Sequence, residues 1–323
     1  MSAPVPRITL LAGGVGGAKL AEGLAAVCPP QRLSIIGNVA DDQEFHGLWV
    51  SPDIDTLTYS LAGLIDRQQG WGLAGESHRL LEGLATLGCE TWMSLGDRDL
   101  ATHVLRTQLR RQGMRPSDIA RHIATALGVE VELLLPTDDR LQTRIRTPEG
   151  WLAFQEYFVR ERCRPDVLQV RLDGVETARP TPEALAAIAD ADLLLIAPSN
   201  PVVSIAPILA VPGIREAIEA SPAPCLAVSP LIGGRTVKGP ADRMLVAAGR
   251  ECSNLGVADG YAPWLDGLMI DHADAADRDH LEARGLRVAT TRTLMADAAD
   301  KARLAGELLA FAETLHGEAL ACP

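Results

Sequence analysis

The chain has 323 residues, of which 47% are hydrophobic and 22% are charged, a composition typical of a soluble globular protein with a full core. Its net charge of -12 argues against nucleic acids and anionic membrane surfaces as partners, and no apolar run is long enough to span a membrane. The six cysteines are scattered without a C-x-x-C pair, and residues 1–9 lack the apolar core of a signal peptide. We therefore expect a cytoplasmic protein with reduced thiols.

The first elements in chain order form a βαβ unit. Ile8–Ala12 and Leu33–Ile36 are short apolar runs that predict buried strands, and Ala18–Val27 has helical spacing between them. A glycine-rich turn, Gly13–Gly17, follows the first strand, and an acid-rich stretch, residues 38–55, follows the second. Ligands bind at the carboxyl ends of parallel strands, so both segments are expected at one edge of the sheet.

Residues 67–179 differ in character, after a helix predicted at Leu57–Ile65. They contain two polar helices, the second capped by Ser117, and two alternating runs that predict an antiparallel hairpin: Leu100–Gln112, Pro116–Leu127, Gln142–Arg146 and Leu152–Val159. We interpret this section as an inserted α+β subdomain.

The βα pattern resumes at Pro182. Strands are predicted at Asp192–Ala197, Cys225–Ser229, Leu268–Asp271 and Arg287–Ala289, and helices at Glu183–Ala189, Gly213–Ala220 and Lys301–Leu315. The pattern predicts an α/β fold, a Rossmann-like three-layer structure with a mostly parallel sheet. We assign residues 1–66 and 180–323 to this core and 67–179 to the insertion, which helps to form a substrate cleft.

The glycine turn matches neither common nucleotide motif. Lys19 stands where the third glycine of G-x-G-x-x-G belongs, and no Gly-Lys-Ser/Thr sequence follows. The backbone of Gly13, Gly14, Gly16 and Gly17, with the helix dipole behind it and Lys19 nearby, is nevertheless suited to phosphate. A tight structural turn is the alternative.

Four carboxylates follow the second strand: Asp41, Asp42, Asp53 and Asp55. Oxygen ligands without His or Cys at metal spacing favour Mg²⁺. We predict Asp41, Asp42 and Asp55 as metal ligands, with Asp42 and Asp55 as catalytic residues. Asp53 and Asp55 would face the same way in an extended segment. The alternative for some of these acids is capping of the helix near Leu57.

Two later loops are expected to complete the site. They carry groups suited to a phosphate or a base edge: Ser199, Asn200, Ser204 and Gly233. Arg235 and Lys238 follow and can supply cations. Simple turn chemistry is the alternative for the first loop.

A charged cluster, Ser94-Leu95-Gly96-Asp97-Arg98-Asp99, precedes His103 and Arg106. An arginine held by flanking aspartates to bind an anion is one interpretation, and a structural ion pair at a helix start is the other. His103 lies at helical spacing from Asp99 and is interpreted as structural. Trp71 and Trp92 are either the wall of a cleft or core.

At these residues the chain resembles the 2-phospho-L-lactate transferase family of coenzyme F-420 biosynthesis. The matching segments run from the first strand to beyond residue 230: LAGGVGGAKL, GNVADD, SPDIDT, RQQGWG, SLGDRDLATH, LLPTDD, FQEYFV, APSNPVVSI and SPLIGG. Strings such as LGDRDLATH and APSNPVVSI are far more specific than a glycine pattern.

The resemblance implies a Mg²⁺-dependent transferase. Such an enzyme moves a phospho-acid moiety from a guanosine diphosphate conjugate to the ribityl hydroxyl of 7,8-didemethyl-8-hydroxy-5-deazariboflavin, and GMP leaves. It also implies a Rossmann-like homodimer in which Asp55 and Ser94 contact the deazaflavin.

Two other classes stay open from the sequence. One is a nucleotide-binding regulatory protein of the same fold without transferase chemistry, which would need the glycine turn but not the acids. The other is an NAD(P)-linked reductase, disfavoured by the missing third glycine. The transferred acid, phospholactyl, enolpyruvyl or phosphoglyceryl, cannot be chosen from these residues.

Overall fold

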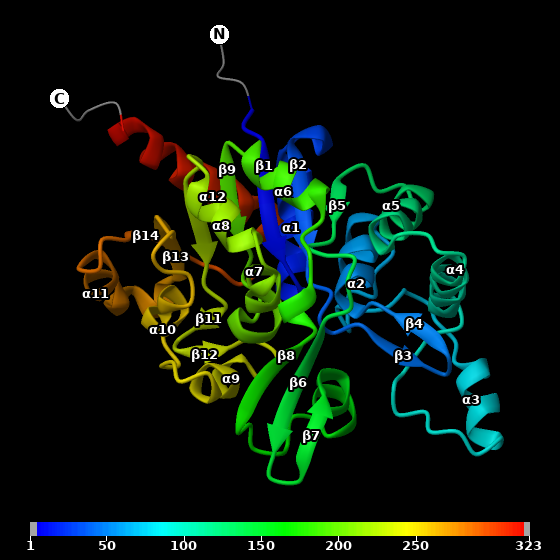
Figure 1. The fold of residues 1–323 in the computed structure, drawn as a ribbon. Helices are drawn as coiled ribbons and strands as arrows, with labels where there is room; N and C mark the ends of the chain where they lie inside the picture. The colour runs from blue at the N-terminus through cyan, green and yellow to red at the C-terminus, as the bar shows by residue number, and fades with distance from the viewer. Residues whose placement is uncertain (1–4, 320–323) are drawn as a thin grey trace.

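A seven-stranded parallel sheet forms the centre of the computed structural model, which describes residues 5–319 (Figure 1). The strand order is β14-β13-β10-β9-β1-β2-β5, and each neighbouring pair is parallel. The strands are β1 (Ile8–Ala12), β2 (Leu33–Gly37), β5 (Glu132–Leu134), β9 (Leu193–Ile196), β10 (Cys225–Val228), β13 (Gly267–Asp271) and β14 (Arg287–Thr291). The predicted α/β class with a parallel sheet is confirmed.

Helices cover both faces of this sheet, which explains why its strands are continuous apolar runs. Helix α1 packs against α2 and α12, whereas α8 packs against α6 and α7; Figure 1 shows α6, α7 and α8 in front of the sheet and α12 behind it. Their bounds are α1 (Gly14–Val27), α2 (Pro52–Leu61), α6 (Pro182–Ala189), α7 (Ala206–Ala210), α8 (Ile214–Ala220) and α12 (Ala298–Ala319). The result is the expected three-layer arrangement.

The remaining helices connect or flank the sheet. They are α3 (Arg79–Thr86), α4 (Asp99–Arg111), α5 (Pro116–Ala126), α9 (Ala241–Ala247), α10 (Asn254–Asp259) and α11 (Arg278–Glu282), with short turns η1 (Pro30–Arg32), η2 (Glu156–Arg160), η3 (Val175–Thr177), η4 (Pro201–Ile205) and η5 (His272–Asp277). Two small hairpins pair β3 (Gln43–Phe45) with β4 (Leu48–Val50) and β11 (Leu231–Ile232) with β12 (Arg235–Thr236).

The middle section of the chain contains an antiparallel three-stranded sheet. Its order is β7-β6-β8, with β6 (Gln142–Thr147), β7 (Gly150–Ala153) and β8 (Gln169–Asp173). The predicted hairpin is confirmed, but its second strand ends early because the Glu156 carboxylate accepts from the Ala153 N–H and the chain enters η2. Strand β5 lies in the central sheet. Part of residues 67–179, which we assigned to an insertion, therefore belongs to the core sheet.

Three local predictions were wrong. Helix α1 begins at Gly14 rather than Ala18, so the glycine turn is its first turn. Helix α2 begins at Pro52, whose fixed φ suits a first helical position, so Asp53 and Asp55 point in different directions. Ser117 lies inside α5, and its N–H and hydroxyl donate to the carboxylate of Asp138.

No single helix among the described residues is both long and apolar enough to cross a membrane. One bent pair, residues 201–210 with 214–220, reaches the required length and composition, with an angle of 84° between its halves.

The start of α1 lies directly on the loop that follows β9. A Cβ at Gly16 would lie 2.2 Å from the carbonyl oxygen of Pro198, and one at Gly17 would lie 2.7 Å from Ser199 Oγ. A side chain at Gly16 would therefore require the backbone to move, and one at Gly17 would displace the Ser199 hydroxyl.

Gly16→Ala is therefore expected to lower the free energy of unfolding by roughly 1–3 kcal/mol, because the methyl group would meet backbone rather than a flexible side chain. Urea denaturation measures this. Gly83→Ala in α3 is the matched control: its Cβ would meet nothing within 4 Å, so it should stabilise by about 0.5–1 kcal/mol. Equal stability of the two variants would contradict the close contact.

Candidate active site

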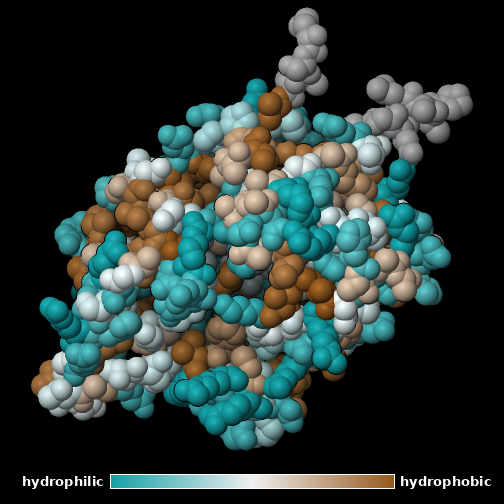
Figure 2. All heavy atoms as spheres, turned by 180° about the vertical axis from the view of Figure 1, so that it is seen from behind, coloured by the Kyte–Doolittle hydropathy of each residue, from teal (hydrophilic) through white to brown (hydrophobic). Residues whose placement is uncertain are grey.

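A cavity of about 560 Å³ opens at the carboxyl edge of the sheet. The strand order reverses between β1 and β9, and the loops that leave such neighbours diverge to form a crevice. Loops after β1, β2, β9, β10 and β14 line the cavity, together with α2, η2 and residues 71–72 and 93–95. Figure 2 shows a hollow near the centre of the rear face, bordered by hydrophobic and hydrophilic residues.

Hydrogen bonds between Gly13 and Ser199 join the loop after β1 to the loop after β9. The Gly13 N–H donates to Ser199 Oγ (3.1 Å), and the Ser199 hydroxyl is 2.7 Å from the carbonyl oxygen of Gly13. Gly14 adopts a φ of 62°, which favours glycine. Gly13, Gly14 and Gly16 line the cavity, so the first turn of α1 faces it.

Asp41 and Asp53 form a buried acidic pair beside the glycine turn, and both line the cavity. Asn38 Nδ2 donates to Asp53 Oδ2 at 2.9 Å, whereas Asp41 Oδ1 has no hydrogen-bond partner. Burial raises the pKa of Asp53 to about 6, and burial together with the charge of Asp53 raises the pKa of Asp41 well above its usual range. Two such carboxylates repel each other unless a proton or a cation lies between them.

Asp42 lies behind this pair and does not line the cavity. Its Oδ2 accepts from Trp49 Nε1 (3.0 Å) and from the Ser51 hydroxyl (2.7 Å). Burial raises the pKa of Asp42 to about 7, although both hydrogen bonds oppose the rise.

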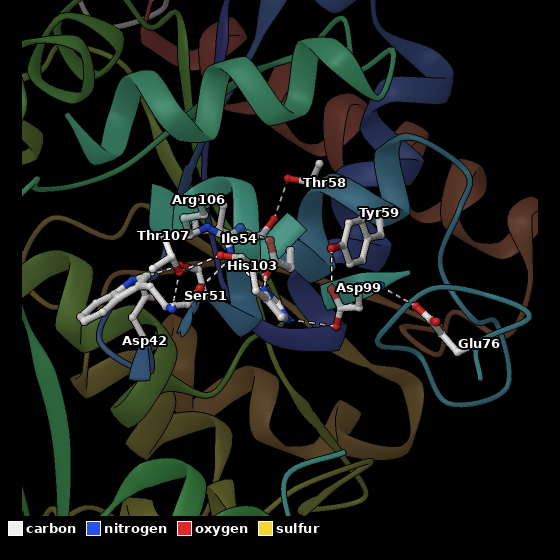
Figure 3. A network of polar contacts seen from close by, with 12 residues as sticks. Asp42, Ser51, Ile54, Thr58, Tyr59, Glu76, Asp99, His103, Arg106 and Thr107 are labelled. Carbon is white, nitrogen blue, oxygen red and sulfur yellow. Dashed lines mark hydrogen bonds and ion pairs between the residues drawn. The ribbon is translucent and has the colours of Figure 1, made fainter. Parts of the chain in front are cut away.

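Asp55 belongs to a buried network that also reaches Asp42, because Arg106 and Asp42 both contact Trp49. Figure 3 shows Arg106, His103, Asp99 and Asp42 in this network. Arg106 on α4 binds both carboxylate oxygens of Asp55 and contacts His103 Nδ1 at 3.2 Å. Asp99 lies on the other side of the ring and accepts from the Tyr59 hydroxyl at 2.6 Å. The network holds Asp55 in a forked pair with Arg106 at the cavity wall.

The contacts of His103 also fix its tautomer. A guanidinium has no acceptor, so Nδ1 must accept from Arg106, which places the ring proton on Nε2. Nε2 lies 3.3 Å from Asp99 Oδ2, outside hydrogen-bond geometry. Ligand atoms of Asp55, Asp99 and His103 lie within 4.8 Å of one another, a grouping that can hold a metal ion. Arg106 already contacts both oxygens of Asp55 and Nδ1 of His103, so an ion in this grouping would compete with Arg106 for these atoms.

The structure brings most of the predicted site residues into the cavity wall and leaves three outside. Those inside are Gly13, Gly14, Gly16, Lys19, Asp41, Asp55, Ser94, Ser199, Asn200 and Ser204. Outside the lining are Gly17, Asp42 and Gly233, and the N–H of Gly233 donates to Asp274 Oδ2.

Several contacts show what the sequence motifs do locally. Asn200 Oδ1 accepts from the N–H groups of Val202 and Val203 and so caps η4, which leaves its amide nitrogen to face the cavity and Met244 Sδ. Arg98 donates to the carbonyl of Ala74 and does not line the cavity, in line with the structural interpretation of its loop.

Trp71 and Trp92 lie in different places. Trp71 lines the cavity, whereas Trp92 packs edge-to-face on Phe45 in a small second core. Sequence reasoning missed Asp53 as the partner of Asp41, and Arg106 and Tyr59 as partners in the Asp55 network.

A doubly wound α/β fold with a glycine-rich helix start and buried carboxylates at its switch point defines an enzyme that transfers phosphate-containing groups. A model of the family described as "2-phospho-L-lactate transferase CofD" matches residues 8–306. The chain belongs to this family and is a CofD-type transferase of coenzyme F-420 biosynthesis.

Named relatives agree with this assignment. The chain is 44% identical to a phosphoenolpyruvate transferase of Kitasatospora aureofaciens over 96% of this chain and 99% of that protein. It is 37% identical to a 2-phospho-L-lactate transferase of Methanosarcina acetivorans over 95% of this chain and 99% of that protein. A crystal structure of a UPF0052 family protein from Bacillus halodurans shares the fold, with a TM-score of 0.63, 18% identity, and coverage of 95% of this chain and 100% of that one.

Asp42 predicts a pH dependence of stability in the metal-free protein. The folded protein keeps this proton up to about pH 7, whereas the unfolded chain releases it near pH 3.8, so stability should fall as pH rises through this window. Between pH 5 and pH 8 the loss is expected to be on the order of 2 kcal/mol.

Urea denaturation in EDTA measures this dependence. Asp42→Asn keeps an acceptor for Ser51 and removes the buried charge, so its stability should fall less steeply with pH. Asp190→Asn, at an exposed position, should leave the slope as it is. The same slope in Asp42→Asn as in the wild type would contradict the assignment.

Proposed function

We propose that the protein transfers a phospho-acid moiety from a guanosine diphosphate conjugate to the ribityl hydroxyl of 7,8-didemethyl-8-hydroxy-5-deazariboflavin. The hydroxyl oxygen attacks the phosphorus that carries the three-carbon acid, the bond to the bridging oxygen breaks, and GMP leaves. The observation that carries the proposal is the juxtaposition of the α1 start with the buried pair Asp41 and Asp53 in one cavity.

For the transferred group we propose enolpyruvyl phosphate. The support is that the bacterial relative named a phosphoenolpyruvate transferase is 44% identical, against 37% for the archaeal 2-phospho-L-lactate transferase. Mass spectrometry of the product formed with the enolpyruvyl, lactyl and glyceryl conjugates of GDP tests this choice. Turnover with the lactyl conjugate alone would contradict it, and turnover with none would contradict the transferase proposal.

Mg²⁺ fits the pair Asp41 and Asp53. An unpartnered, buried oxygen on Asp41 and a neighbouring carboxylate offer the hard oxygen ligands that Mg²⁺ takes alongside substrate phosphates. We propose Asp53 in place of Asp42 and Asp55 in the metal set, because Asp42 is turned away and Arg106 occupies both oxygens of Asp55. When bound, the ion would neutralise charge on the diphosphate.

The remaining groups position the two substrates. The first turn of α1 lines the cavity, and a helix start of this kind suits the diphosphate. Asp55 is held in place by Arg106 and lines the cavity, so it can accept a hydrogen bond from the ribityl hydroxyl and orient it. A carboxylate already bound by a guanidinium is a weaker proton acceptor, so we assign Asp55 to positioning of the acceptor.

Apolar walls suit the flat deazaflavin. Trp71 and Met93 line the cavity together with Phe154 and Phe158, whose rings stack with centroids 5.5 Å apart. Ser94 lies between Met93 and Leu95 in the same wall. These walls come from the middle section of the chain, which supports the proposal that residues 67–179 help to form the acceptor cleft.

We also propose that the protein is a cytoplasmic homodimer. The five cysteines that the structure describes are free thiols, as a reducing compartment favours. Light scattering of the purified protein tests the dimer.

The metal proposal predicts distinct effects of neutral variants. Asp41→Asn and Asp53→Asn should each lower turnover in Mg²⁺ by at least about 100-fold, because each removes a ligand charge. Without metal, Asp41→Asn should unfold at a higher temperature than the wild type at pH 8, since a buried repulsion is gone. The increase in unfolding temperature caused by Mg²⁺ should disappear in both variants. Asp190→Asn is the control, and full activity in both variants would refute the metal proposal.

The acceptor proposal predicts the effect of a bulky residue at Ser94. Ser94→Trp should abolish deazaflavin binding, followed by the fluorescence of the ligand, because the indole would fill the wall beside Met93. GDP affinity, measured by calorimetry, should stay within about twofold. Normal deazaflavin binding by this variant would place the acceptor elsewhere.

A further inference from the structure

The cavity has a second charged end, formed by lysines. Lys19, one turn into α1, donates to the carbonyl oxygen of Met295 at 2.8 Å. Lys238, between β12 and α9, donates to the carbonyl oxygen of Gln69 at 2.7 Å. Both side chains line the cavity, and each ammonium has further N–H groups to donate. Arg235, on β12 three residues before Lys238, is exposed and lies outside the lining.

The acid that acts on Lys19 already has partners of its own. Glu22 on α1 is paired with Lys301 of α12 and with Arg67. Burial and the charges of Lys301 and Lys238 lower the pKa of Lys19, whereas the charge of Glu22 opposes this shift. An anion bound beside Lys19 and Lys238 would offset the repulsion between their charges.

Lys19 and Lys238 line the same cavity as the first turn of α1 and the acids of α2. A Cβ built at Gly70 would lie 2.9 Å from Val15 Cγ1 and 3.7 Å from Lys238 Nζ, so Lys238 is close to that first turn. A diphosphate bound at the α1 start is therefore in one cavity with both lysines, which can meet a further anionic group of the same ligand.

We propose that Lys19 and Lys238 bind the carboxylate of the three-carbon acid that is transferred. This inference rests on the proposed function, in which the donor carries one diphosphate and one carboxylate. The start of α1 and the metal match the diphosphate, which leaves the carboxylate without a partner. Among the described residues that line the cavity, Lys19 and Lys238 are the two lysines, and there is no arginine. They select a donor that carries an acid over one that carries a neutral alcohol.

The test compares two donors in a binding measurement. One is the enolpyruvyl conjugate of GDP, and the other is the ethyl ester of GDP, which has the diphosphate but no carboxylate. Calorimetry in Mg²⁺ gives the Kd of each, and of GDP itself, for the wild type, Lys238→Met and the control Arg235→Met. Methionine keeps the length of the side chain and removes the charge.

The wild type and Arg235→Met are expected to bind the enolpyruvyl conjugate at least about tenfold more tightly than the ethyl ester, as a charge-assisted hydrogen bond implies. Lys238→Met should lose this preference while its Kd for the ethyl ester and for GDP stays the same. In turnover, its KM for the enolpyruvyl conjugate should rise while kcat changes little.

Two results would overturn the inference. Equal weakening of all three ligands in Lys238→Met would assign the lysine to the diphosphate, and an unchanged preference would remove it from donor recognition. Binding without transfer by the wild type would refute the proposed function and still decide the role of Lys238, because the Kd values do not depend on chemistry.

Discussion

Burial of four carboxylates in one region is the constraint on which the rest of the site depends. A buried negative charge is costly unless it is paired, hydrogen-bonded or neutralised, and each of these acids meets the cost differently. Arg106 pairs with Asp55, two side-chain donors bind Asp42, and Asn38 binds Asp53. Asp41 and Asp42 each keep one oxygen, Oδ1, without a hydrogen-bond partner, and of these two residues Asp41 lines the cavity. The Asp41 oxygen is therefore the one that a group entering the cavity can reach.

The cavity wall consequently carries charges of both signs. Acids from α2 and the loop after β2 line it together with Lys19 and Lys238. A ligand with clustered negative charges and an apolar, flat partner fits this wall, since it also contains Trp71 and the stacked rings of Phe154 and Phe158. The net charge of -12 does not oppose such a ligand, because the local field at the lysines has the opposite sign.

The sequence predicted the sheet well and the directions of side chains less well. Apolar runs such as Ile8–Ala12 must be buried on both faces, so their identity as parallel strands could be read directly. The helix that begins at Pro52 was predicted to begin near Leu57. Asp53 and Asp55 were therefore assigned to an extended segment, in which their side chains would point the same way. The network around Asp55 had a signal: Asp99, His103 and Arg106 are spaced by four and three residues, which puts them on one face of a helix. That spacing could not reveal Asp55 as the partner of Arg106, since this pairing depends on how α4 lies relative to α2 in the folded protein.

The contact between the α1 start and the β9 loop has a consequence for the order in which the protein is made. Gly13 and Ser199, which exchange two hydrogen bonds, are 186 residues apart in the chain. During synthesis the N-terminal βαβ unit leaves the ribosome well before the segment that completes its glycine turn. The phosphate-facing turn therefore takes its final shape only after β9 has joined the sheet. Until then no partly made chain holds a finished cavity in which a nucleotide could be bound or consumed.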